Sequence, residues 1–134
     1  MRTHRTAIGV AFALQLCIAV SAQYAGWTIP ENAASEKSPL APSADNITKG
    51  RSLFASNCQK CHGPLGKGDG PDSDARRPAA DLTDEFRYDI NPDGVVYHKI
   101  MNGRPPDMPA FKSTLSRNEA WAVVEYVKSL RKPQ

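Results

Sequence analysis

Two cysteines and a histidine within five residues constrain this chain more than any other feature. The segment Cys58-Gln59-Lys60-Cys61-His62 has the spacing Cys-x-x-Cys-His, the attachment signature of a covalently bound c-type haem. Two thiols at this spacing can form thioethers with the two vinyl groups of one porphyrin, and the adjacent imidazole can ligate its iron. The motif therefore predicts one haem c (the cofactor and its iron), with Cys58 and Cys61 as attachment points and His62 as an axial ligand.

Two other kinds of site use the same residue types. A thioredoxin-like dithiol normally lies near a strand-helix-strand pattern, which this sequence lacks. A zinc site needs a fourth ligand beside the three, and only His98 or a carboxylate is left to supply it. Both comparisons favour the haem interpretation.

The first 22 residues have the pattern of an export signal. A basic start is followed by an apolar stretch over residues 7–20 and by the small-residue cleavage site Val20-Ser21-Ala22. We therefore predict a periplasmic protein whose mature chain starts at Gln23. The apolar stretch is shorter than the roughly 20 residues of a bilayer-spanning helix, so an uncleaved membrane anchor is the less favoured alternative.

Removal of this segment simplifies the remaining composition. Of the three cysteines, Cys17 leaves with the signal, so no structural disulfide is predicted and the haem takes over the stabilising role. Removing 22 of 134 residues leaves 112, enough for one compact domain. Removing Arg2 and Arg5 from the 17 basic residues leaves 15 against 14 acidic ones, a formal charge of +1 that gives no support to nucleic-acid binding.

Residues 23–44 form an irregular leader ahead of a haem domain at 45–134. Pro30, Pro39 and Pro42 interrupt any helix in the leader. Its main apolar group is Trp27 with Ile29, and it either packs back on the domain or stays disordered.

The first of three predicted helices spans about 47–57, with Asp45 or Asn46 as its N-cap. Gly50, Phe54 and the first motif cysteine recur every four residues and share one face. Glycine is a poor helix former, so its place in mid-helix indicates the close approach of another backbone or ring.

The second helix spans about 92–102, with Asn91 as its cap and Gly103 just past its end. Val96 and Ile100 are its core candidates.

The third helix starts at the capping box of Ser116 and Glu119 and runs to about Leu130 with a broad apolar face. Residues 63–90 are predicted to be a long loop whose glycines permit tight turns around the haem edge.

The sixth iron ligand must come from downstream of the motif. Met108 is preferred, because it lies in Pro105-Pro106-Asp107-Met108-Pro109, a stretch that cannot be helical and can present a thioether from a loop. Met101 lies within the second helix and is expected to be packing. Met101, His98 and an open site remain the alternatives.

The segment 50–130 resembles the class I c-type cytochromes, the small monohaem family of bacterial periplasmic proteins. The resemblance implies an all-α, cytochrome c-like fold with three main helices and a long loop around one covalent haem. It also implies that the first and last helices cross where Gly50 and Phe54 meet Val123 and Tyr126. The motifs that carry it are Gly50-x-x-x-Phe54, Cys58-x-x-Cys61-His62-Gly63, Gly66-Lys67-Gly68-Asp69-Gly70-Pro71, Asp93-Gly94, Gly103-Arg104, Met108-Pro109-Ala110-Phe111 and residues 121–130.

The same resemblance implies the surroundings of the haem. A proline carbonyl is expected to accept a hydrogen bond from the second nitrogen of His62, and Pro78 is identified as that residue, with Pro71 as the alternative. The candidate partners of the haem propionates are Tyr97 and Arg104, and less so Arg76 and Arg77, for which surface solvation is favoured.

A His-Met pair leaves no open site on iron, so the predicted function is single-electron transfer rather than chemistry on a substrate. The expected partners of a monomer, or of weak complexes, are a membrane respiratory complex, a periplasmic dehydrogenase or a terminal oxidase. A basic rim that would steer an acidic partner is formed by Lys60, Lys67, Lys99 and Lys112, unless these are ordinary solvated lysines. The alternatives are a haem enzyme or gas sensor with an open sixth site, and a dedicated electron-accepting subunit of one oxidoreductase complex.

Overall fold

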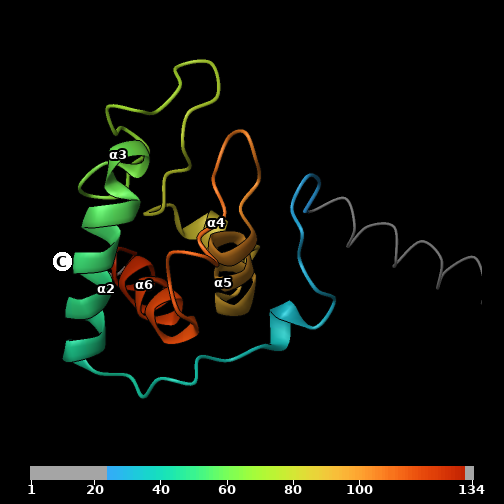
Figure 1. Cartoon of the computed structure of the whole chain (residues 1–134), viewed down its shortest axis with the longest axis vertical. Helices are drawn as coiled ribbons and strands as arrows, with labels where there is room; N and C mark the ends of the chain where they lie inside the picture. The colour runs from blue at the N-terminus through green and yellow to red at the C-terminus, as the bar shows by residue number, and fades with distance from the viewer. Residues whose placement is uncertain (1–23, 132–134) are drawn as a thin grey trace, which may run out of the picture.

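The computed structural model describes residues 24–131, so the predicted signal segment and its cleavage site lie outside the described residues. Figure 1 shows helices joined by long loops; between residues 24 and 131 no strand is assigned, only two isolated β-bridges. The prediction of an all-α fold is confirmed. The elements in chain order are the 3-10 helix η1 (Ala33–Ser35) and the α-helices α2 (Ala44–Asn57), α3 (Gln59–His62), α4 (Glu85–Asp89), α5 (Asp93–Asn102) and α6 (Arg117–Ser129).

Helices α2 and α6 cross at Gly50, as the resemblance implied. A Cβ atom at this glycine would overlap the Ala122 carbonyl oxygen and lie 2.9 Å from Tyr126 Cβ. One helical turn further, the Phe54 ring meets the Tyr126 ring edge-on at a centroid distance of 5.2 Å. Val123 is buried beside them. The glycine is therefore needed because the backbone of α6 occupies the space of a side chain.

Helix α5 joins this core through aromatic stacking. Tyr97 lies parallel to Trp121 of α6, with ring centroids 4.6 Å apart and an interplanar angle of 6°. Ile100 is 5% exposed and so belongs to the core as predicted, whereas Val96 is only partly buried against it. Val95, which the four-residue spacing did not select, is fully buried.

Two of the predicted helix caps are wrong. Ser43, in extended conformation after a proline, caps α2 by accepting a hydrogen bond from the Asn46 amide at 3.1 Å. Asp45 instead lies in the first turn, where its charge complements the helix dipole. Helix α5 has no side-chain cap, because its N-cap residue is Pro92 and the Oδ1 atom of Asn91 accepts from Lys99 Nζ instead.

The other helix ends follow the sequence. The capping box at the start of α6 is present in both directions, with Ser116 Oγ accepting from the Glu119 amide and the Glu119 carboxylate accepting from the Ser116 amide. Gly103 ends α5 with φ of +63°, in the left-handed region.

The leader packs on the domain instead of being disordered. It runs along the side of α5 that faces away from α2 (Figure 1). Ala33 is fully buried, and its carbonyl oxygen occupies the space that a side chain at Gly94 of α5 would need. The Asn102 side chain donates to the Thr28 carbonyl oxygen at 2.9 Å. Tertiary contacts along its length therefore compensate for its lack of regular structure.

The long connection between α3 and α5 contains the short helix α4, which the sequence did not predict. Asp84 caps it by accepting from the Phe86 amide at 3.0 Å. Within residues 24–131, no helix is long and apolar enough to cross a membrane.

Candidate functional site

The Cys-x-x-Cys-His motif forms the short helix α3, which continues directly from α2. The Cys58 amide donates to the Phe54 carbonyl oxygen at 2.8 Å, and the His62 amide donates to the Cys58 carbonyl oxygen at 2.9 Å. Cys58 is buried and Cys61 is partly exposed. The core helix therefore fixes the position of both thiols and of the imidazole.

The thiol of Cys58 lacks the character of a redox nucleophile. Burial, and to a lesser extent the neighbouring Cys61, raise the pKa of the Cys58 thiol to about 12. The attacking thiol of a redox dithiol has a lowered pKa, because the thiolate is the nucleophile. Cys58 therefore does not fit that role.

A backbone carbonyl group orients the His62 imidazole. Its Nδ1 lies 3.0 Å from the Ala80 carbonyl oxygen, and a carbonyl can only accept, so in the neutral ring Nδ1 carries the proton and Nε2 keeps its lone pair. Burial lowers the pKa of the imidazole, while this hydrogen bond opposes the shift. Burial therefore favours the neutral ring, the form in which histidine can bind a metal.

The prediction that the Pro78 carbonyl accepts this bond is wrong, and so is its alternative, Pro71. The Ala79 amide is fixed by Ser73 Oγ at 3.0 Å, and the chain then brings the next carbonyl, that of Ala80, to the imidazole. A carbonyl belongs to every residue, so no residue type marks the acceptor in the sequence.

The glycine-rich turn after the motif closes over the end of α3. The amides of Gly68 and Gly70 donate to the carbonyl oxygens of His62 and Cys61, at 2.8 and 3.1 Å. Gly68 has φ of +79°, which a residue with a side chain rarely adopts. The turn therefore satisfies carbonyl groups at the helix end that would otherwise lack partners.

Met108 lies at the end of a small hairpin that begins after Gly103. The Arg104 amide donates to the Met108 carbonyl oxygen at 2.8 Å, and the Met108 amide donates back at 3.1 Å. Asp107 in this hairpin forms an ion pair with Arg77 at 2.6 Å. The hairpin of Met108 is thereby tied to the loop that follows His62. The sequence did not indicate this role of Asp107 and Arg77.

Of the alternative sixth ligands, the structure gives only His98 a polar partner. Met101 lies in α5 and, like Met108, is partly buried against the core, so burial does not separate the two methionines. His98 Nε2 lies 2.7 Å from Glu36 Oε2, so its imidazole is paired with the leader.

Two buried side-chain nitrogens fit the polar groups of a haem. Arg104 Nε and Trp121 Nε1 are buried and have no hydrogen-bond partner within residues 24–131. Both carry an N–H that only donates, so the partner that satisfies them is an acceptor, such as a propionate carboxylate. This fits the predicted role of Arg104, whereas the described contact of Tyr97 is its stacking on Trp121.

The predicted basic rim loses one of its four lysines. The side chains of Lys60, Lys67 and Lys112 are exposed, which fits a rim and ordinary solvated lysines equally, so for these three the rim stays a prediction. Lys99 is partly buried, with Nζ 4.7 Å from the centre of the Trp27 ring. Its inclusion in the rim was wrong, because the leader covers it.

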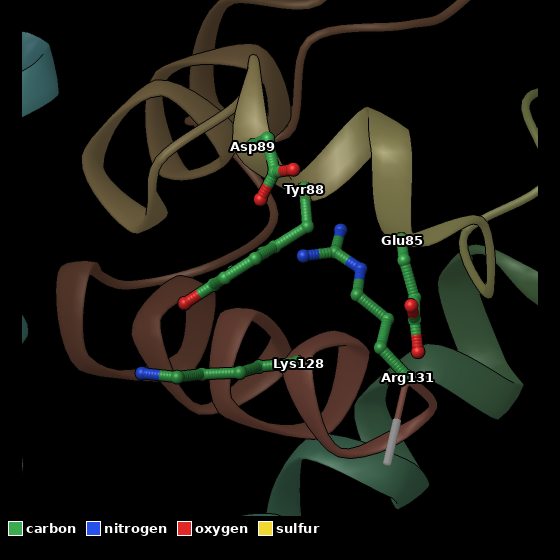
Figure 2. Close-up of a pocket in the computed structure, with 5 residues that line it drawn as sticks. All are labelled: Glu85, Tyr88, Asp89, Lys128 and Arg131. Atoms are coloured by element: carbon green, nitrogen blue, oxygen red, sulfur yellow. The ribbon is translucent and has the colours of Figure 1, made fainter. Parts of the chain in front are cut away.

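A surface pocket of about 330 Å³ lies between α4 and the end of α6 (Figure 2). The Arg131 guanidinium lies over the Tyr88 ring, 4.6 Å from its centre, and carboxylates of α4 stand nearby. No predicted haem residue lines this pocket; its lining residues are Glu85, Tyr88, Asp89, Lys128 and Arg131.

Comparison with known proteins places residues 45–127 in the family described as cytochrome c oxidase, cbb3-type, subunit III. The cbb3-type cytochrome c oxidase subunit FixP of Bradyrhizobium diazoefficiens is 33% identical over 85 residues, which are 63% of this chain and 28% of that protein. FixP of Azorhizobium caulinodans is 34% identical over 82 residues, 61% of this chain and 26% of that protein. The match covers less than a third of the length of these relatives.

Solved structures show the same fold. A chain of the Kuenenia stuttgartiensis reducing HAO-like protein complex Kustc0457/Kustc0458 superposes with a TM-score of 0.54 at 31% identity, over 70% of this chain and 47% of that one. The c-type cytochrome KustC0563 superposes with a TM-score of 0.56 at 28% identity, over 62% of this chain and 98% of that one. The cytochrome c-like fold expected from the resemblance is therefore confirmed.

The family match includes both the Cys-x-x-Cys-His helix and the hairpin of Met108, and the described site has thiols, a neutral imidazole and buried donors that suit a porphyrin. This chain therefore belongs to the family of cbb3-type cytochrome c oxidase subunit III, as a c-type cytochrome that holds covalently attached haem c and transfers electrons.

Proposed function

We propose that this protein carries single electrons between periplasmic or membrane redox proteins through a haem c ligated by His62 and Met108. The observation that carries the proposal is the ion pair of Arg77 with Asp107, which ties the hairpin of Met108 to the loop following His62. Bound haem supplies one-electron chemistry, because its iron alternates between the ferrous and ferric states. A thioether ligand favours the ferrous state and so raises the reduction potential.

The protein residues position the proposed ligands and exclude other molecules from the iron. Ala80 orients the imidazole of His62 through its carbonyl group. The Met108 hairpin supplies a soft ligand from a backbone that two hydrogen bonds and an ion pair hold in place. If His62 and Met108 both ligated the iron, no position would remain there for a substrate or dioxygen.

The ligand assignment is tested by comparing Met108→Ala with Met101→Ala. The wild-type ferric protein should show the thioether-to-iron charge-transfer band and, when reduced, bind carbon monoxide poorly. Met108→Ala should lose the band, bind carbon monoxide readily and have a lower potential. Met101→Ala is the matched control and should retain the wild-type spectrum.

Wild-type protein that binds carbon monoxide rapidly and completely would contradict the proposal. It would favour instead the haem enzyme or gas sensor with an open sixth site.

A second candidate function is that of a dedicated electron-accepting subunit. It is favoured by the comparisons, since the FixP relatives are named as oxidase subunits and one similar structure belongs to a reducing HAO-like protein complex. Affinity purification of the native protein from its own cells distinguishes the two functions. A stoichiometric complex that survives salt supports the subunit, whereas a free monomer with only salt-sensitive contacts supports the carrier.

The proposed periplasmic location has its own measurement. N-terminal sequencing of the native protein should start at Gln23, whereas an intact Met1 on membrane-bound protein would show an uncleaved anchor.

A further inference from the structure

The leader residues 24–36, here called the leader strap, attach to the domain at two separate places. At the end nearer α2, Glu36 pairs with His98 at 2.7 Å and with Arg117 at 3.3 Å. At the other end, Trp27 lies over the start of the Met108 hairpin. The family match begins only at residue 45, so the leader strap is outside the part shared with the matched family.

The Trp27 end packs against the side chain of Arg104, which remains 41% exposed. The guanidinium carbon of Arg104 lies 5.1 Å from the centre of the Trp27 ring, a distance typical of a cation–π contact. The preceding Gly26 has φ of +79°, and a Cβ atom there would lie 3.3 Å from Arg104 Cδ. The hydrogen bond from Asn102 to the Thr28 carbonyl oxygen holds this end in place. Arg104 is thus confined by backbone and ring together.

The other contacts of Arg104 are with the hairpin that carries Met108. Its backbone pairs with that of Met108, and its guanidinium forms an ion pair with Asp107 at 3.3 Å. Its Nε remains buried without a partner among the described residues. Arg104 therefore contacts the leader strap and other residues of the Met108 hairpin, and its Nε is a donor left for an acceptor.

We propose that Trp27 is a positioning residue, which holds the Arg104 guanidinium toward a haem propionate and thereby raises the reduction potential. A fixed positive charge beside the haem stabilises the ferrous state relative to the ferric state. Without the ring of Trp27, the side chain of Arg104 swings into solvent, where water screens its charge. This inference rests on the proposed electron-transfer function, and it assigns to the leader strap the tuning of that function.

The test is a double-mutant cycle on the holoprotein. The midpoint potential of each variant is measured by optical redox titration. Trp27→Ala should lower the potential, and Trp27→Leu, which keeps apolar bulk but has no ring, should lower it as well. Trp27→Phe should restore most of the wild-type value. Arg104→Gln should also lower the potential, and adding Trp27→Ala to it should cause no further shift, because Trp27 acts through Arg104.

Glu36→Gln is the matched control, since it loosens only the other end of the leader strap. It should leave the potential unchanged, and a shift as large as that of Trp27→Ala would overturn the specific role of the Trp27 end. The proposal is also overturned if Trp27→Ala and Trp27→Leu keep the wild-type potential, or if Trp27→Ala lowers the potential equally with and without Arg104.

The same samples separate this inference from the ligand assignment. If Met108 is not the ligand, the thioether charge-transfer band is either missing from the wild type or retained in Met108→Ala, whatever the cycle shows. If only the leader-strap proposal fails, the wild-type band is present and the cycle shows no coupling between Trp27 and Arg104.

Discussion

The crossing of α2 and α6 and the two loops beside it are held together in different ways. At the crossing, backbone and rings of the protein meet directly, with Gly50 against α6 and Phe54 against Tyr126. The loop at 63–84 is hydrogen-bonded to the end of α3, the loop at 103–112 is hydrogen-bonded to the end of α5, and the ion pair of Arg77 with Asp107 joins the two loops. The helices thus form a core from protein atoms alone. The loops are expected instead to enclose the covalently attached haem.

The largest expected effect is the loss of the covalently attached haem. Replacing both Cys58 and Cys61 by serine should abolish covalent haem attachment, because no thiol remains to form a thioether. Each single replacement should only weaken maturation. Extraction with acidified acetone followed by haem staining measures the outcome. A red protein that survives extraction in the double variant would refute the attachment sites.

The next largest effect is expected on the stability of the crossing between α2 and α6. Gly50→Val should lower the free energy of unfolding by about 1–3 kcal/mol or more, because the added atoms overlap the Ala122 carbonyl group. Denaturant unfolding of the holoprotein measures it. Lys49→Ala on the exposed face of α2 is the control, with an expected change within about 0.5 kcal/mol. Equal stability of the two variants would show that α6 does not approach α2 this closely.

A smaller effect is expected at the start of α6. Ser116→Ala should cost about 1 kcal/mol of stability through loss of the capping box. Hydrogen bonds from Ser116 lower the pKa of Glu119, so the contribution of this carboxylate is present above its unfolded pKa and is lost as pH falls through its folded pKa. The difference in unfolding free energy between the wild type and Ser116→Ala should therefore become smaller in acid. Ser113→Ala, an exposed serine outside the helix, should show neither effect.

The smallest effect concerns the lysine beneath the leader strap. Burial, followed by the charges of Arg104 and Arg87, lowers the pKa of Lys99 from 10.5 to about 8. Between these values the unfolded chain binds more protons than the folded one, so stability contributed by this site rises with pH. Lys99→Met should remove that rise, measured as the difference in unfolding free energy between pH 8 and pH 10. An identical pH dependence of both proteins would show that Lys99 is solvated in the folded state.

Local sequence patterns predicted local structure well where one residue type has one function. The Ser116–Glu119 box and the glycine past α5 each depend on a few neighbouring residues, and the structure contains the cap and the left-handed turn that they imply. The Cys-x-x-Cys-His spacing predicted the haem c that the family match supports. The cap of α2 was misplaced by two residues or more, since Ser43, Asp45 and Asn46 all have suitable side chains. Helix α4 was missed because five residues carry too little periodicity to distinguish a helix from a loop.

The sequence by itself determined the attachment chemistry, the all-α fold and the need for a glycine where α2 meets α6. Only the tertiary structure decided that Ala80, not Pro78, orients His62, that Asp107 joins the Met108 hairpin to the loop after His62, and that the leader strap packs against Arg104 and Lys99. The physical reason is that motifs and helix periodicity depend only on residues that are close together in the sequence. A backbone carbonyl, an ion pair between distant loops and a stacked ring acquire their roles only when folding brings distant segments together.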